Sequence, residues 1–331
     1  MNRFQGRHLA LIGAKILLSI GLMAMLLWRI RFDQLAATLR QADPLWLVAA
    51  WLLMLTSNLL GSYQWARLLQ VVKIPIPYWK AAAYYHIGLF FNNFLPANIG
   101  GDLARVADTS RHGDRSKSAA VSGVLMDRMV GTLALAGMAL VTTLPAVTRY
   151  HLAFVYLALV GFFLLSLALL FAAFHPAVIP ALCRGLDRIG LHRVSPHLVD
   201  IAERLGSFRG QPGLFVEIFL VAVVTQISRI GVHALVARSL GIHLPFQYFL
   251  LFVPLLAVIG SLPISVNGIG VREGAGVILF GLVGVDRAHA FSLQFATYLV
   301  AVAVSLLGGF VFLLRIPHRR AVSRKLMEEV E

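Results

Sequence analysis

The sequence predicts an all-α polytopic membrane protein with about six full transmembrane helices and two broken, re-entrant helical elements in a pseudo-symmetric inverted repeat. The first observation is composition: 59% of the 331 residues are hydrophobic and 13% are charged, whereas a soluble domain has about 45–50% and about 25%. The second is a set of apolar runs with the length that a spanning helix needs, about 20 residues. The third is a break rich in Pro and Gly that occurs once in each half of the chain. The alternative architecture is eight full spans.

Six apolar runs are long enough to cross a membrane alone. They cover residues 9–28, 45–69, 118–142, 152–174, 214–240 and 288–314. Two further stretches are shorter, 78–95 and 247–262; each ends at a Leu-Pro pair, and a run over 271–282 follows the second. Because Pro lacks an N–H and Gly frees the backbone, both residues interrupt helices. We therefore expect each shorter stretch to enter the membrane, break, and leave on the side from which it came.

The basic residues between the runs orient the chain. Lys and Arg number 29 against 15 Asp and Glu, a net charge of +14. The basic segments share one side if the two shorter stretches do not cross, and the positive-inside rule makes that side cytoplasmic. We therefore expect a multi-pass protein of a bacterial-type cytoplasmic (inner) membrane with both termini in the cytoplasm. Eight spans would instead place the basic segment 100–117 outside. Anionic lipids are expected partners of this charge, and nucleic acid is not.

The apolar runs leave no room for a soluble domain. We expect a single integral membrane domain over residues 1–331, with halves at approximately 1–150 and 151–331. Residues 175–213 form a polar connection whose two amphipathic segments favour short helices on the cytoplasmic membrane surface. Residues 315–331 are expected to form a basic cytoplasmic tail.

Each break carries the same kinds of residue in the same order. The first reads LPANIGGDLAR and ends at Arg105; the second reads LPISVNGIGVREG and contains Arg272. Glycines at a helix start leave backbone N–H groups that bind anions, assisted by the helix dipole. An Arg close to that start adds a fork of donors that matches phosphate oxygens. The alternative is that Asp102 and Arg105, like Arg272 and Glu273, simply neutralise each other.

Two adjacent ionisable residues, Asp127 and Arg128, lie within the apolar run 118–142. Such groups are costly in lipid unless they are paired or wetted. Since neighbours on a helix point about 100° apart, we expect one to reach the break at Asp102 and the other the break at Arg272. The alternative is a position at the membrane interface.

A polar stripe at 226, 229 and 233 follows the i, i+3, i+7 pattern of one helix face and favours a water-filled groove. The residues predicted to contact a lipid headgroup are Asn98, Gly100, Gly101, Asp102, Arg105, Asp127, Arg128, Asn267, Gly268, Gly270, Arg272 and Glu273. The residues predicted to line a groove beside them are His86, Asn92, Asn93, Gln226, Arg229 and His233.

No motif in the sequence indicates a metal, a cofactor or a catalytic centre. The chain has no HExxH motif, no cysteine cluster, no Walker-type phosphate loop and no nucleophile elbow. Its single cysteine, Cys183, cannot form an internal disulfide. We therefore predict no cofactor, no metal, no catalytic residue and no enzymatic activity.

Three segments, FNNFLPANIGGDLARV, MDRMVG and LPISVNGIGVREGA, together resemble the lysylphosphatidylglycerol synthase transmembrane-region family, the flippase-like half of the multiple peptide resistance factor. The resemblance extends over residues 45–314. It implies translocation or handling of a phosphate-bearing lipid. Full-length synthases also carry a soluble aminoacyl-transferase domain, so we expect this chain to be a stand-alone membrane half. The family's motif positions fall on Gly100, Gly101, Asp102 and Arg105, on Asp127 and Arg128, and on Gly268, Gly270, Arg272 and Glu273.

Three functions are compatible with these observations. The first is a lipid flippase-like transporter that binds a phospholipid or polyprenyl phosphate at the two Gly–Arg breaks. The second is an accessory partner of a lipid or polyprenyl-phosphate biosynthetic enzyme, in which the charges only pack. The third is an integral-membrane lipid transferase that uses the carboxylates as acid, base or Mg²⁺ groups, although the clustered carboxylates of a two-metal site are missing.

Overall fold

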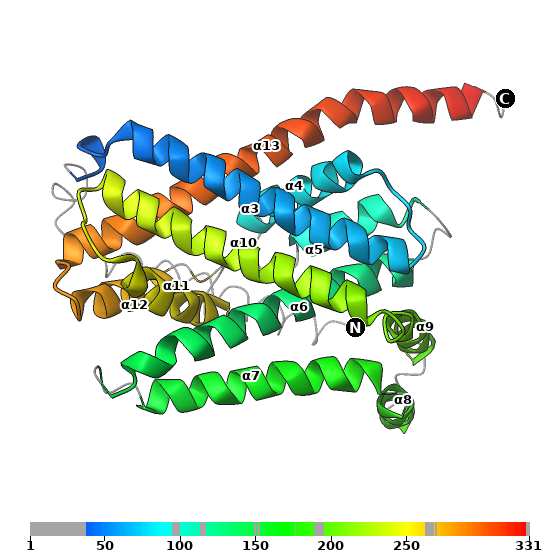
Figure 1. Cartoon of the computed structure of the whole chain (residues 1–331). Helices are drawn as coiled ribbons and strands as arrows, with labels where there is room; N and C mark the ends of the chain where they lie inside the picture. The colour runs from blue at the N-terminus through cyan, green and yellow to red at the C-terminus, as the bar shows by residue number, and fades with distance from the viewer. Residues whose placement is uncertain are drawn as a thin grey trace.

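The computed structural model describes residues 38–94, 100–112, 117–148, 150, 153–175, 177–188, 195–261, 268 and 270–328. The regular elements within these ranges are all helices (Figure 1). The first predicted span, 9–28, lies outside the described residues. The all-α membrane fold predicted from the sequence is confirmed.

Five of the described helices are long and apolar enough to cross a membrane. They are α3 (Pro44–Val71), α6 (Lys117–Thr143), α7 (Ala153–Phe174), α10 (Pro212–Ser239) and, over its first 29 residues, α13 (Arg287–Glu328). Each helix occupies one of the predicted runs. Both α3 and α10 begin at a proline, where the missing N–H has no helical partner to lose. A 3₁₀ turn, η1 (Leu144–Ala146), follows α6.

The two shorter apolar stretches each fold as a pair of helices. The first pair is α4 (Tyr78–Phe94) packed against α5 (Gly100–Thr109), and the second is α11 (Phe246–Ser261) packed against α12 (Val271–Gly281). The 17 residues of α4 extend about 26 Å at about 1.5 Å per residue, less than the hydrocarbon core of about 30 Å. Each pair is a hairpin of two helices packed against each other, as the predicted re-entrant elements require. That neither pair crosses the membrane stays a prediction.

The two hairpins occupy equivalent places in an inverted repeat. One half runs α3, α4–α5, α6, and the other runs α10, α11–α12, α13. Figure 1 shows α3 and α10 side by side with opposite chain directions, and these two helices make the most extensive contact in the bundle. The hairpin of each half packs against a helix of the other half: α4 packs on α13, and α11 packs on α6. The hairpins therefore approach the middle of the bundle from opposite ends.

Two short helices, α8 (Val178–Arg188) and α9 (Ser195–Gly206), follow the end of α7. They lie together at one end of the bundle, beside the start of α10 (Figure 1). The Ser195 hydroxyl donates to Asp187 at 2.6 Å and joins the two helices. Both helices separate apolar from polar residues on opposite faces, as the sequence predicts for the connection 175–213.

The helix α7 stands at the edge of the bundle and packs mainly on α6 (Figure 1). Leu159 is its single buried residue, whereas Phe154 and Phe171 are exposed. An apolar helix with so little buried surface belongs in lipid. The site therefore has to be built from the remaining helices, which surround the two hairpins.

Candidate functional site

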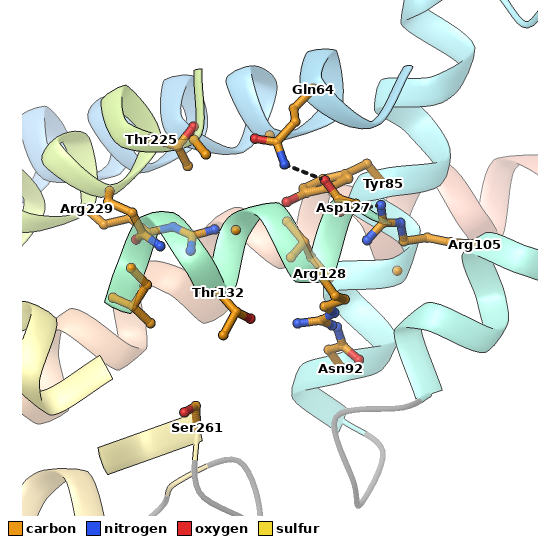
Figure 2. A pocket seen from close by; sticks show the side chains of 17 residues that line it. Gln64, Tyr85, Asn92, Arg105, Asp127, Arg128, Thr132, Thr225, Arg229 and Ser261 are labelled. Carbon is orange, nitrogen blue, oxygen red and sulfur yellow. Dashed lines mark hydrogen bonds and ion pairs between the residues drawn. The ribbon is translucent and has the colours of Figure 1, made fainter. Parts of the chain in front are cut away.

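Two adjoining cavities lie where the hairpins meet α3, α6 and α10. The first has a volume of about 240 Å³ and is lined from both halves of the chain, from Gly61 on α3 to Ser261 on α11 (Figure 2). The second has a volume of about 290 Å³ and reaches Arg272 on α12. Leu135, Gln226 and Arg229 line both cavities. We call the two together the joined cavity.

Arg105 of α5 is fixed at one end of the joined cavity. Its Nη2 lies 2.7 Å from Oδ2 of Asp127 on α6, and its guanidinium lies over the rings of Trp65 and Tyr85, at 4.2 Å and 4.7 Å from their centroids. Gln64 donates to the other Asp127 oxygen at 2.9 Å. Arg105 is only 5% exposed. A charge paired, stacked and buried in this way fastens α5 to its neighbours. The buried Nε of Arg105 has no hydrogen-bond partner in the described part of the chain.

Arg128 holds the same helix from a second direction. Its Nε and Nη2 each donate to a different oxygen of Asp102, both at 3.0 Å, and its side chain is 48% exposed. Asp127 and Arg128 thus both engage α5, through Arg105 and Asp102 respectively. The expectation that one of them would reach the break at Arg272 is wrong. The two side chains leave α6 in different directions, but both reach residues of α5.

Gly101 of the first hairpin allows close packing of α5 on α4. The N–H of Gly101 donates to Oδ1 of Asn92 at 2.9 Å, so the preceding helix caps this amide. A Cβ on Gly101 would overlap the carbonyl oxygen of Gly88 and come within 2.5 Å of Asn92 Cγ. The prediction of a free anion-binding amide is therefore wrong at Gly101.

The second hairpin is fastened more weakly. Gly270 has φ of 83°, a conformation that favours glycine, and its N–H donates to Oε2 of Glu273 at 2.6 Å, so this amide is also occupied. Nη2 of Arg272 lies 3.3 Å from the other Glu273 oxygen. Its guanidinium lies 5.7 Å from the ring of Tyr298. The buried Nε of Arg272 has no hydrogen-bond partner in the described part of the chain.

The α10 helix supplies the centre of the joined cavity. Gln226 and Arg229 line both parts, and His233 lines the second. Figure 2 shows the Arg229 side chain pointing from α10 into the first cavity. Within the described ranges no side chain pairs with the Arg229 guanidinium. The hydroxyl of Thr225, a residue only 6% exposed, likewise lacks a partner there and lines the first cavity.

The family profile described as "Lysylphosphatidylglycerol synthase TM region" matches residues 12–309, which include both hairpins and α10. The chain belongs to this family. Membership in the lysylphosphatidylglycerol synthase TM-region family indicates a role related to membrane lipids. No curated protein matches the chain.

The remaining residues that the sequence predicts for the site differ in whether they line the joined cavity. Asn98 and Asn267 lie outside the described residues. Asn92 lines the first cavity, whereas His86 and Asn93 line neither. His86 is buried, with Nδ1 hydrogen-bonded to the carbonyl of Ala82 at 2.9 Å, and its role as a groove residue stays a prediction. Among the residues that the structure describes, no group of three His, Cys, Asp or Glu side chains is arranged to hold a metal.

Four residues of the site in this family member were not predicted. Gln64, Trp65 and Tyr85 enclose the Arg105–Asp127 pair, and Thr225 precedes the polar stripe on α10. Gln64 interrupts the apolar run 45–69, so its polarity was a usable signal. The two aromatic residues carried no such signal, because aromatic side chains are ordinary in an apolar run.

Proposed function

We propose that this protein is a lipid flippase-like transporter that brings the anionic, phosphate-bearing headgroup of a lipid to the joined cavity. The observation that carries the proposal is the Arg229 guanidinium, which lies on the wall of both cavities without a counter-charge in the described structure. An unpaired charge in a membrane interior is costly. A bound phosphate would offset that cost.

The surrounding groups support an anionic ligand. The Thr225 hydroxyl and Nε of Arg272 are further donors without a partner among the described residues. Phosphate oxygens accept several hydrogen bonds at once and form strong ones with guanidinium groups. Arg105 is engaged elsewhere, so the headgroup contacts are proposed for Arg229 and Arg272, with Arg105 holding the wall of the cavity.

The inverted repeat supports movement of that headgroup across the membrane. In transporters of this architecture the substrate lies between the repeats, at broken helices, and one repeat moves against the other. Here the joined cavity lies between hairpins that approach from opposite ends. We propose a cytoplasmic-membrane location with the basic end, which carries α8 and α9, in the cytoplasm together with both termini.

A transferase reaction fits the geometry less well. Asp102 and Asp127 each accept hydrogen bonds from an arginine, and Glu273 accepts from the Gly270 amide. These carboxylates are the groups that acid, base or Mg²⁺ chemistry would need. The accessory-partner alternative instead requires that the unpaired charge of Arg229 be dispensable, and the transport experiment tests that requirement.

The experiment measures movement of tail-labelled phosphatidylglycerol across the bilayer of proteoliposomes. We expect Arg229→Ala and Arg272→Ala to slow it by roughly tenfold or more, the effect of about 1.4 kcal/mol at the rate-limiting interaction. Arg204→Ala is the matched control, because this arginine pairs with Asp200 on α9, away from the joined cavity. Equal rates in all four proteins would exclude the proposed function.

A further inference from the structure

Among the described residues, the joined cavity carries one positive charge more than the carboxylates beside it neutralise. Three arginines meet three carboxylates there: Arg105 pairs with Asp127 and, at 3.6 Å, with Asp102; Arg128 pairs with Asp102, and Arg272 with Glu273. Arg229 is a fourth guanidinium, and the described residues offer it no fourth carboxylate. The ionised groups that the structure describes at the cavity therefore sum to a single excess positive charge.

The residues that join the two helices of each hairpin in the sequence carry no charge of their own. Residues 95–99 read LPANI, and residues 262–267 read LPISVN, followed by Ile269. These segments contain no ionisable side chain.

Resting on the proposed function, we propose that the site selects lipid headgroups with one net negative charge, the phosphodiester class, over phosphomonoesters. A phosphodiester carries one charge, whereas a phosphomonoester carries about −1.5 to −2 at neutral pH because its second pKa is near 6. The single excess charge at Arg229 neutralises the first ligand. The second ligand leaves uncompensated negative charge in a membrane interior beside three carboxylates, which is costly.

Glu273 and Asp102 set this preference by compensating the positive charges of Arg272 and Arg128. Glu273→Gln removes one negative charge and keeps an oxygen that can accept from the Gly270 amide. Asp102→Asn removes one negative charge in the other half of the site and keeps an acceptor for Arg128. Either change raises the excess to two positive charges and should favour the dianionic headgroup.

The experiment compares two lipids with the same labelled chains, phosphatidylglycerol and phosphatidic acid, in phosphatidylcholine proteoliposomes. The buffer is kept at about pH 9, well above the second pKa of a phosphate monoester, so that the monoester is mostly dianionic. The measured quantity is the ratio of their translocation rates. We expect a ratio of roughly ten in favour of phosphatidylglycerol for the unmodified protein, and a shift of roughly tenfold toward phosphatidic acid in Glu273→Gln and in Asp102→Asn.

Glu217→Gln is the matched control for charge. Glu217 lies on α10, the helix of Arg229, but pairs with Arg67 at 2.9 Å and lines neither cavity. Its ratio should equal that of the unmodified protein. Equal rates for the two lipids in the unmodified protein, or an unchanged ratio in both carboxylate variants, would overturn the selectivity and leave the proposed function standing. Movement of neither lipid would remove the proposed function itself.

Discussion

The two hairpins share a local sequence pattern and differ in what holds their arginines. In the first, Arg105 is paired with Asp127 of another helix at 2.7 Å and enclosed by Trp65 and Tyr85. In the second, Arg272 has one charged contact, 3.3 Å from its own neighbour Glu273. The comparison teaches that the motif alone does not decide the role of its arginine. Residues on distant helices decide whether that arginine anchors the fold or remains available to a ligand.

The two halves of the repeat also differ in how firmly ion pairs hold their hairpins. The α5 helix is tied to α6 by two ion pairs, so the first hairpin is built as a fixed wall. The charged contact of α12 stays within its own first turn. If the repeats move against each other during transport, the second hairpin has fewer polar contacts to break.

The largest expected effect separates the two arginines by stability. Arg105→Ala leaves the Asp127 carboxylate buried without a cation and removes the stacking on two rings, so we expect a loss of about 3–5 kcal/mol. Arg272→Ala removes a longer contact of 3.3 Å and leaves Glu273, which is 2% exposed, with the Gly270 amide as its donor, so we expect a smaller loss of about 1–3 kcal/mol. Thermal unfolding of both variants in the same detergent measures the difference. Similar losses of stability would contradict the division into an anchor and a ligand-binding arginine.

A smaller effect is expected at the glycine of the first hairpin. A Cβ at position 101 collides with the backbone of Gly88 and with Asn92, so Gly101→Ala should separate α4 from α5 and cost about 1–3 kcal/mol. Gly161→Ala on α7 is the matched control, since no atom lies within 4 Å of its added Cβ. That control should be neutral or slightly stabilising, because Ala is the better helix former. Equal unfolding temperatures for the two variants would show that the hairpin does not depend on this close approach.

The helices of this fold are well predicted from the sequence, because a membrane helix is recognised by the apolar composition of one continuous stretch of residues. The apolar runs locate α3, α6, α7, α10 and α13, and the Leu-Pro breaks locate both hairpins. The i, i+3, i+7 spacing correctly places Gln226, Arg229 and His233 on one face. Each of these features depends on residues within a few turns of one another.

The pairing of charges at the site could not be predicted in the same way. Arg105 meets Asp127 across 22 residues, and Gln64 meets the same carboxylate across 63. Nothing in the spacing of these residues states which helices become neighbours. From the sequence alone, Arg105 and Arg272 have the same expected role. Nothing in the sequence distinguishes Arg229 as the guanidinium without a partner in the described structure.

The central claim is that the joined cavity receives a lipid headgroup at Arg229. The most direct measurement is a cryo-EM reconstruction of the protein in nanodiscs that contain phosphatidylglycerol. We predict headgroup density between the two hairpins, with phosphate oxygens about 2.7–3.0 Å from the Arg229 guanidinium. A well-resolved cavity with no lipid density, and with Arg229 paired to a carboxylate of the chain itself, would contradict the account.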